Sequence, residues 1–142
     1  MPNTMLPALF LDMPAFVYKE ELKSAPVVGW YLQRGGMLPV ARDEGASALK
    51  SMLRAGKQAI AAGQQIVIFP EGTRQPVGAP PDYKPGIAAL YLSLKLPCTP
   101  IALSTGVIWP NKGVDRHPGV AKLRILPAIP AGLSREDFMR EL

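Results

Sequence analysis

An uninterrupted apolar run at residues 66–68, Ile-Val-Ile, constrains the fold of this chain most strongly. Because no polar residue alternates with these side chains, the run predicts a strand covered on both faces, as in a parallel sheet flanked by helices. Pro70 has no N–H to give to a strand ladder, so it suits the end of a strand. We therefore expect a buried strand over residues 66–69 that opens into a polar loop.

A helix is predicted directly before this strand, over residues 46–62. Its apolar and polar side chains separate at helical spacing, and Gly63 follows it as a helix-ending residue. The expected inner face consists of Leu49, Met52, Leu53, Gly56 and Ile60, and the outer face of Lys50, Arg54, Lys57 and Gln58.

The remaining patterns extend the alternation of strands and helices. Short strands are expected at residues 16–18, 38–40, 99–103 and 120–125, with Lys122 and Arg124 on a wetter face in the last of them. Pro85 opens a helix with Ile87, Leu90, Tyr91 and Leu94 inward, and Ser134 begins a capped helix. The order predicts an α/β fold with a mostly parallel or mixed sheet flanked by helices, in one domain over residues 1–142.

Residues 27–32, Val-Val-Gly-Trp-Tyr-Leu, are apolar and aromatic and lie between Lys23 and Arg34. Such a segment is typical either of a core helix or of a surface that dips into a membrane interface. We favour the core helix.

The loop at residues 69–74, Phe-Pro-Glu-Gly-Thr-Arg, has the chemistry of an anion site. Gly72 allows a ligand to approach the backbone closely, Thr73 carries a hydroxyl donor, and Arg74 offers a planar charged fork that matches phosphate. Glu71 would repel a phosphate, so we expect it to order the loop by accepting hydrogen bonds or pairing with a base. An ordinary solvated loop is the alternative interpretation of the same residues.

As a whole, this hexapeptide resembles the glycerol-phosphate-binding motif of the 1-acylglycerol-3-phosphate O-acyltransferase family. Segments at residues 19–22, 26–30, 36–42, 83–86 and 96–102 follow in the order and approximate spacing of that family, so the resemblance runs from about residue 16 to residue 142. It implies a glycerolipid acyltransferase-like fold, here incomplete.

The resemblance also implies a function. A fatty acyl group would pass from acyl-CoA or acyl carrier protein to lysophosphatidate, giving phosphatidate, with no cofactor and no metal. The implied phosphate-binding residues are Arg74, Thr73, Gly72, Glu71, Lys19 and Arg42. Lys19 can equally be an ordinary surface lysine, and Ala41, where relatives often carry an acidic residue, makes Arg42 a less direct match.

The family's catalytic signature, a His followed five positions later by an Asp, does not occur in the sequence. The one histidine, His117, is followed at that spacing by Lys122 and lies in a polar turn, which is typical of a solvated loop histidine. An acceptor hydroxyl needs a general base to attack a thioester, and removing such a base costs on the order of 10² to 10⁴ in rate. We therefore expect a chain truncated at its amino end, or alternatively a lipid- or phosphate-binding remnant without turnover.

Net charge and cysteine content limit the binding partners and the covalent cross-links that this chain can have. A net charge of +5 favours anionic partners such as phosphate head groups and acidic lipid surfaces, whereas no motif or basic run supports nucleic-acid binding. Cys98 is the only cysteine, which excludes an intrachain disulfide, and it is expected as a small core residue. The apolar stretch at residues 5–11 is too short to span a bilayer. We expect peripheral association with the cytoplasmic face of a membrane, although a helix upstream remains compatible with the family.

Overall fold

The computed structural model describes residues 11–40, 45–109 and 117–142. By their contacts they divide into two compact units, which meet along the chain between Ile68 and Phe69. The expected single domain stays a prediction.

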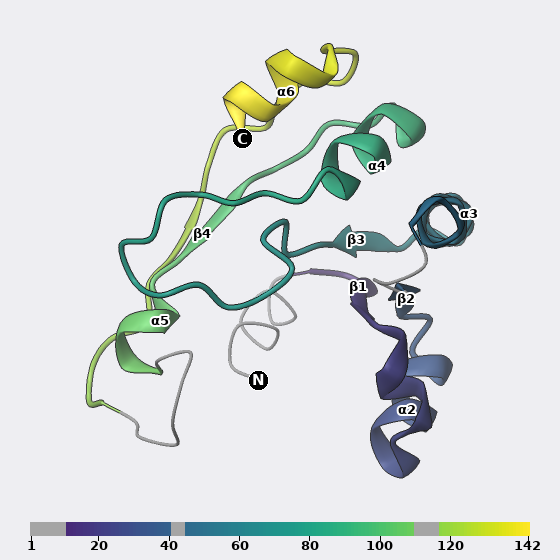
Figure 1. The fold of residues 1–142 in the computed structure, drawn as a ribbon, viewed down its shortest axis with the longest axis horizontal. Coiled ribbons are helices and arrows are strands. Elements are labelled where there is room, and N and C mark those ends of the chain that lie inside the picture. The colour runs from purple at the N-terminus through teal and green to yellow at the C-terminus, as the bar shows by residue number, and fades with distance from the viewer. Residues whose placement is uncertain (1–10, 41–44, 110–116) are drawn as a thin grey trace. The chain divides into compact units, whose positions relative to one another are not determined.

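The first unit contains a three-stranded parallel sheet (Figure 1). Its elements are β1 (Pro14–Lys19), the 3₁₀ helix η1 (Glu20–Ser24), α2 (Pro26–Arg34), β2 (Leu38–Val40), α3 (Ala46–Ala61) and β3 (Gln65–Val67). The strand order is β2-β1-β3. Phe16 is paired with Val67 in one ladder and Val17 with Leu38 in the other. Pro39 has no N–H to donate, and it lies in an edge strand, where that is tolerated.

Helix α3 packs against this sheet and builds its core. Ala15, Leu38 and Ala59 are buried together, and Ala55 and Ile66 pack against them. Gly63 follows the helix with a φ of +76°, which confirms it as the residue that ends the helix. The expected inner face was wrong at Leu49, which is exposed, because the buried row instead runs through Ala48, Met52, Gly56 and Ala59.

Two other expectations for this unit need correction. Strand β3 ends at Val67, and Ile66, Val67 and Ile68 are only half-buried; among the described residues, β3 pairs with β1 alone. The favoured core interpretation of the segment at residues 27–32 was also wrong. Val27, Trp30 and Tyr31 are 79%, 59% and 64% exposed on α2.

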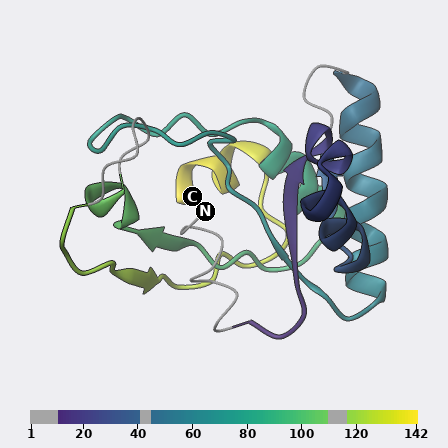
Figure 2. The same cartoon turned by 90° about the horizontal axis from the view of Figure 1, so that it is seen from below.

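The second unit consists of the long loop at residues 69–85, α4 (Gly86–Leu94), β4 (Ile101–Leu103), α5 (Thr105–Ile108), β5 (Leu123–Ile125) and α6 (Arg135–Glu141). β4 and β5 run antiparallel side by side, with Ala102 opposite Arg124 (Figure 2). Both strands are shorter than expected. The described strands thus form mixed α/β topology, as predicted, but in two separate sheets.

The core of the second unit forms where α4 packs on α6. The rings of Tyr91 and Phe138 stack with centroids 3.9 Å apart and planes inclined by 9°, and Phe138 is fully buried. Ile87, Ala88 and Leu90 are buried on the same helix, whereas Leu94 is only half-buried. Ser134 caps α6 by accepting a hydrogen bond from the backbone N–H of Asp137, as its sequence predicted.

Candidate functional site

The loop at residues 69–74 forms a tight turn just beyond the end of β3. Gly72 has a φ of +68°, a left-handed conformation that glycine adopts without steric cost, and its N–H donates to the carbonyl of Phe69 over 3.0 Å. The backbone N–H of Lys84 donates to the carbonyl of Pro70 over 2.8 Å, so the loop is held at its base by the segment that leads into α4. These two backbone hydrogen bonds fix the path of the turn.

The side chains of this turn divide by exposure. Thr73 and Arg74 are exposed, while Glu71 and Gly72 are half-buried. A hydroxyl and a guanidinium side chain, both groups that can donate hydrogen bonds to an anion, are therefore exposed on this turn. The structure brings four of the six predicted phosphate-binding residues together on this one turn.

Lys19 lies in the other unit, as the last residue of β1 and the residue that caps η1. Its Nζ is 3.8 Å from a carboxylate oxygen of Glu21, and both side chains are about half or more exposed. Because β1 and β3 are parallel, Lys19 lies at the carboxyl edge of the sheet, the edge at which Ile68 leaves β3. Arg42 lies outside the described residues.

Lys84, which follows the turn, and His117, the histidine of the chain, both have partners in the structure. Lys84 pairs with Asp82 over 2.5 Å, both being exposed, and α4 begins at Gly86 behind Pro85 as an ordinary helix start. His117 is exposed, and its backbone N–H donates to the carbonyl of Ile108 over 2.9 Å. Its place in a surface loop agrees with the sequence-based interpretation.

Cys98 lies beside the antiparallel strands, in an isolated bridge with Ile129. Desolvation by burial raises the pKa of its thiol, which keeps it protonated and weakly nucleophilic. This supports a packing role for Cys98. Among the described residues, no group of three or more His, Cys, Asp or Glu side chains is placed to hold a metal ion.

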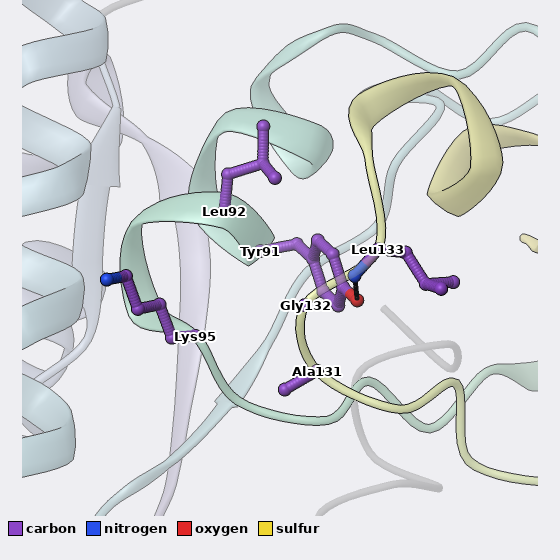
Figure 3. Close-up of a pocket in the computed structure, with 6 residues that line it drawn as sticks. All are labelled: Tyr91, Leu92, Lys95, Ala131, Gly132 and Leu133. Carbon is purple, nitrogen blue, oxygen red and sulfur yellow. Dashed lines mark hydrogen bonds between the residues drawn. The ribbon is translucent and has the colours of Figure 1, made fainter.

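A pocket that the sequence did not indicate lies between the end of α4 and the loop before α6. It has a volume of about 390 Å³, and its lining residues are Tyr91, Leu92, Lys95, Ala131, Gly132 and Leu133. Figure 3 shows the ring of Tyr91 directed toward the backbone of Gly132 and Leu133. The Tyr91 hydroxyl accepts a hydrogen bond from the N–H of Leu133 over 3.0 Å and donates one to the carbonyl of Pro130.

Of the predicted phosphate-binding residues that the structure describes, none lines this pocket. The sequence predicted one feature of this pocket, the inward direction of Tyr91 on its helix. The loop that forms the other wall could not be predicted, because it lies some forty residues further along the chain. No periodicity connects two segments so far apart in sequence.

Comparison with known proteins shows what the chain is similar to. The family model described as Acyltransferase matches residues 3–104. The 1-acyl-sn-glycerol-3-phosphate acyltransferase of Pseudomonas aeruginosa is 35% identical over 122 residues, which cover 86% of this chain and 48% of that protein. The human 1-acyl-sn-glycerol-3-phosphate acyltransferase beta is 27% identical over 123 residues, covering 85% and 44% respectively.

A solved structure agrees with these sequences. The crystal structure of the 1-acyl-sn-glycerophosphate (LPA) acyltransferase PlsC from Thermotoga maritima superimposes with a TM-score of 0.64 at 28% identity, covering 93% of this chain and 53% of that one. The chain thus spans about half the length of the proteins it matches.

Proposed function

Because the chain belongs to the acyltransferase family, we propose that it forms the acceptor-binding part of an enzyme that acylates 1-acylglycerol-3-phosphate to phosphatidate. The acyl donor in this proposal is acyl-CoA or acyl carrier protein. The observation that carries the proposal is that the family match spans the turn at residues 71–74, on which Thr73 and Arg74 are exposed. The reaction in this proposal is the one that the relatives' names state, and the turn carries the hydrogen-bond donors that would bind the phosphate of the acceptor.

In this proposal Arg74 binds the phosphate of the acceptor. The guanidinium can donate two parallel hydrogen bonds to phosphate oxygens, and such charge-assisted pairs are stronger than neutral hydrogen bonds. Thr73 adds a hydroxyl donor, while the left-handed backbone at Gly72 has no side chain to obstruct the phosphate. Glu71, half-buried, orders the turn rather than contacting the anion.

Lys19 is proposed as a second phosphate contact. Its position at the carboxyl edge of a parallel sheet supports this role, since ligands of α/β proteins bind beyond that edge. Its pairing with Glu21 is long and exposed, so it costs little to exchange that carboxylate for a phosphate. Arg42 remains a proposal from the family resemblance alone.

The transfer itself needs a base to take the proton of the acceptor hydroxyl as the oxygen attacks the thioester carbon. The carbon–sulfur bond then breaks, and the thiolate of CoA or of the carrier protein leaves and takes up the proton from the base. One observation favours the alternative of binding without turnover by this chain: its one histidine, His117, has Lys122 rather than an Asp five positions on.

The two possibilities are separated by assaying the chain directly. Transfer of a labelled acyl group from acyl-CoA or acyl carrier protein to 1-acylglycerol-3-phosphate would show turnover. Saturable binding of that acceptor without transfer would show the binding function alone.

The phosphate site is tested with Arg74→Ala, using Arg124→Ala on β5 as a matched control at another exposed arginine. Losing a charge-assisted hydrogen-bond pair corresponds to about a ten- to hundredfold weaker affinity for lysophosphatidate. Affinity for a monoacylglycerol, which lacks the phosphate, should not change. Equal lysophosphatidate affinity in the two variants would remove Arg74 from the site.

The acceptor is a membrane lipid, and for that reason we further propose that the protein works peripherally at a membrane surface, on the cytoplasmic face as the resemblance implies. None of the helices in the described ranges is long and apolar enough to span a bilayer.

A further inference from the structure

Helix α2 carries an exposed apolar stripe that the proposed acceptor site does not use. Trp30 and Tyr31 lie three and four residues after Val27 and four and three residues before Arg34, so these four side chains share one face, which we call the α2 outer face. Val27 is 79% exposed, and Trp30 and Tyr31 are both more than half exposed. Single exposed apolar side chains are common, but a contiguous exposed group with two aromatic rings is typical of an interaction surface.

The packing of α2 fixes this face outward. Gly29 is the buried residue of the helix, and a Cβ built on it would lie 2.1 Å from the backbone oxygen of Lys23. The backbone of α2 is therefore pressed against η1 through the absent side chain of Gly29. Since Gly29 lies on the side of the helix opposite Val27 and Tyr31, this close contact turns the aromatic stripe away from the unit.

The charges around the stripe identify its partner. Helix α2 contains no acidic residue, and the guanidinium carbon of Arg34 lies 5.1 Å from the centre of the Trp30 ring. The acidic side chains of the neighbouring turn are paired with bases, Glu20 with Lys23 over 2.8 Å and Glu21 with Lys19 over 3.8 Å. The only charge on the outer face is thus the cation of Arg34.

A bilayer surface offers what this arrangement requires. Tryptophan and tyrosine place an apolar ring among acyl chains and a polar edge among head groups, and arginine reaches back to bind phosphate oxygens. A protein partner would have to supply an apolar surface and also an acidic group for Arg34. The excess of 16 basic over 11 acidic residues in the chain adds a general attraction to anionic lipid.

We propose that the α2 outer face docks on the headgroup boundary of a phospholipid bilayer, with Val27, Trp30 and Tyr31 inserted and Arg34 bound to lipid phosphate. The choice of a lipid partner rests on the proposed function, because an enzyme that acylates a membrane lipid must meet the membrane. Docking itself needs no turnover, so it is measured without acyl transfer.

The test uses Trp30 as its own reporter. Trp30 and Trp109 are the two tryptophans, so Trp109→Phe leaves Trp30 as the sole fluorophore. Vesicles of phosphatidylglycerol and phosphatidylcholine containing a lipid brominated along its acyl chain should quench Trp30 fluorescence. If Trp109→Phe fails to fold, Trp30→Phe in the otherwise unchanged chain serves instead, and it should abolish the quenched component.

A matched pair of substitutions then tests the face. Val27→Asp and Val120→Asp introduce the same carboxylate at two valines that are each 79% exposed, the second lying outside α2. Val27→Asp should weaken vesicle partitioning about ten- to hundredfold, because it removes an inserted apolar side chain and adds an anion, whereas Val120→Asp should leave it unchanged. Circular dichroism should show both variants folded.

Three results would overturn the proposal: no quenching by brominated vesicles, equal loss of partitioning in the two aspartate variants, or a wild-type dimer that Val27→Asp dissociates without any lipid quenching. The last would assign the face to a second copy of the chain. If the chain does not dock on vesicles but still binds lysophosphatidate in a way that depends on Arg74, the docking face alone is refuted. If it docks on vesicles but its lysophosphatidate binding does not depend on Arg74, the phosphate site alone is refuted.

Discussion

Deleting the hydroxyl of Tyr91 should lower the free energy of unfolding by an amount that can be worked out from the two hydrogen bonds it makes. The oxygen accepts from the Leu133 N–H over 3.0 Å and donates to the carbonyl of Pro130, so it ties α4 to the loop before α6. Tyr91→Phe removes both bonds and leaves a part-buried N–H without this partner. The ring remains available to stack on Phe138.

Each hydrogen bond of this kind contributes roughly 0.5–1.5 kcal/mol, so the free energy of unfolding should fall by about 1–3 kcal/mol. Urea unfolding followed by circular dichroism measures this, and the slope against urea should not change because the surface exposed on unfolding is the same. Tyr31→Phe is the matched control, since that ring is 64% exposed on α2 and its loss of a hydroxyl should cost less than about 0.5 kcal/mol. Equal stabilities of the two variants would refute the argument that the hydroxyl secures the loop.

Two further predictions concern α2 and α6. Gly29→Ala should destabilise the chain by about 1–3 kcal/mol despite the better helix propensity of alanine, because the new Cβ would lie 2.1 Å from a backbone oxygen. Gly106→Ala is the control and should cost less, since its Cβ would meet only a side-chain methyl at 3.3 Å. Equal urea midpoints of the two variants would contradict this. The hydrogen bond from the hydroxyl that caps α6, helped by the charge of Arg140, lowers the pKa of Asp137 below its ordinary value of 3.8. The charged form therefore stabilises the folded chain above about pH 4, and that contribution is lost as the pH falls through the lowered pKa. The stability difference between the natural chain and Asp137→Asn should accordingly shrink below pH 3.8, and a constant difference from pH 7 to pH 3 would contradict the assignment.

Local features of the fold could be predicted from the amino-acid sequence. Helical spacing and Gly63 predicted α3 and its end, and Ser134 predicted the cap of α6, because these depend on the propensities and hydrogen bonds of neighbouring residues. The turn at residues 69–74 was also predicted, since proline and glycine impose backbone geometry wherever they occur.

Which surfaces are covered depends on long-range packing and could not be predicted from the sequence. The apolar pattern of α2 is compatible with a core or with an exposed face, and the contact of Gly29 with the backbone of Lys23 selects the exposed one. The antiparallel pairing of β4 with β5 and the stacking of Tyr91 on Phe138 likewise join segments distant in sequence. A periodic pattern shows that a segment has an apolar face, but burial depends on which partner the chain brings to that face, and that information lies in contacts between residues far apart.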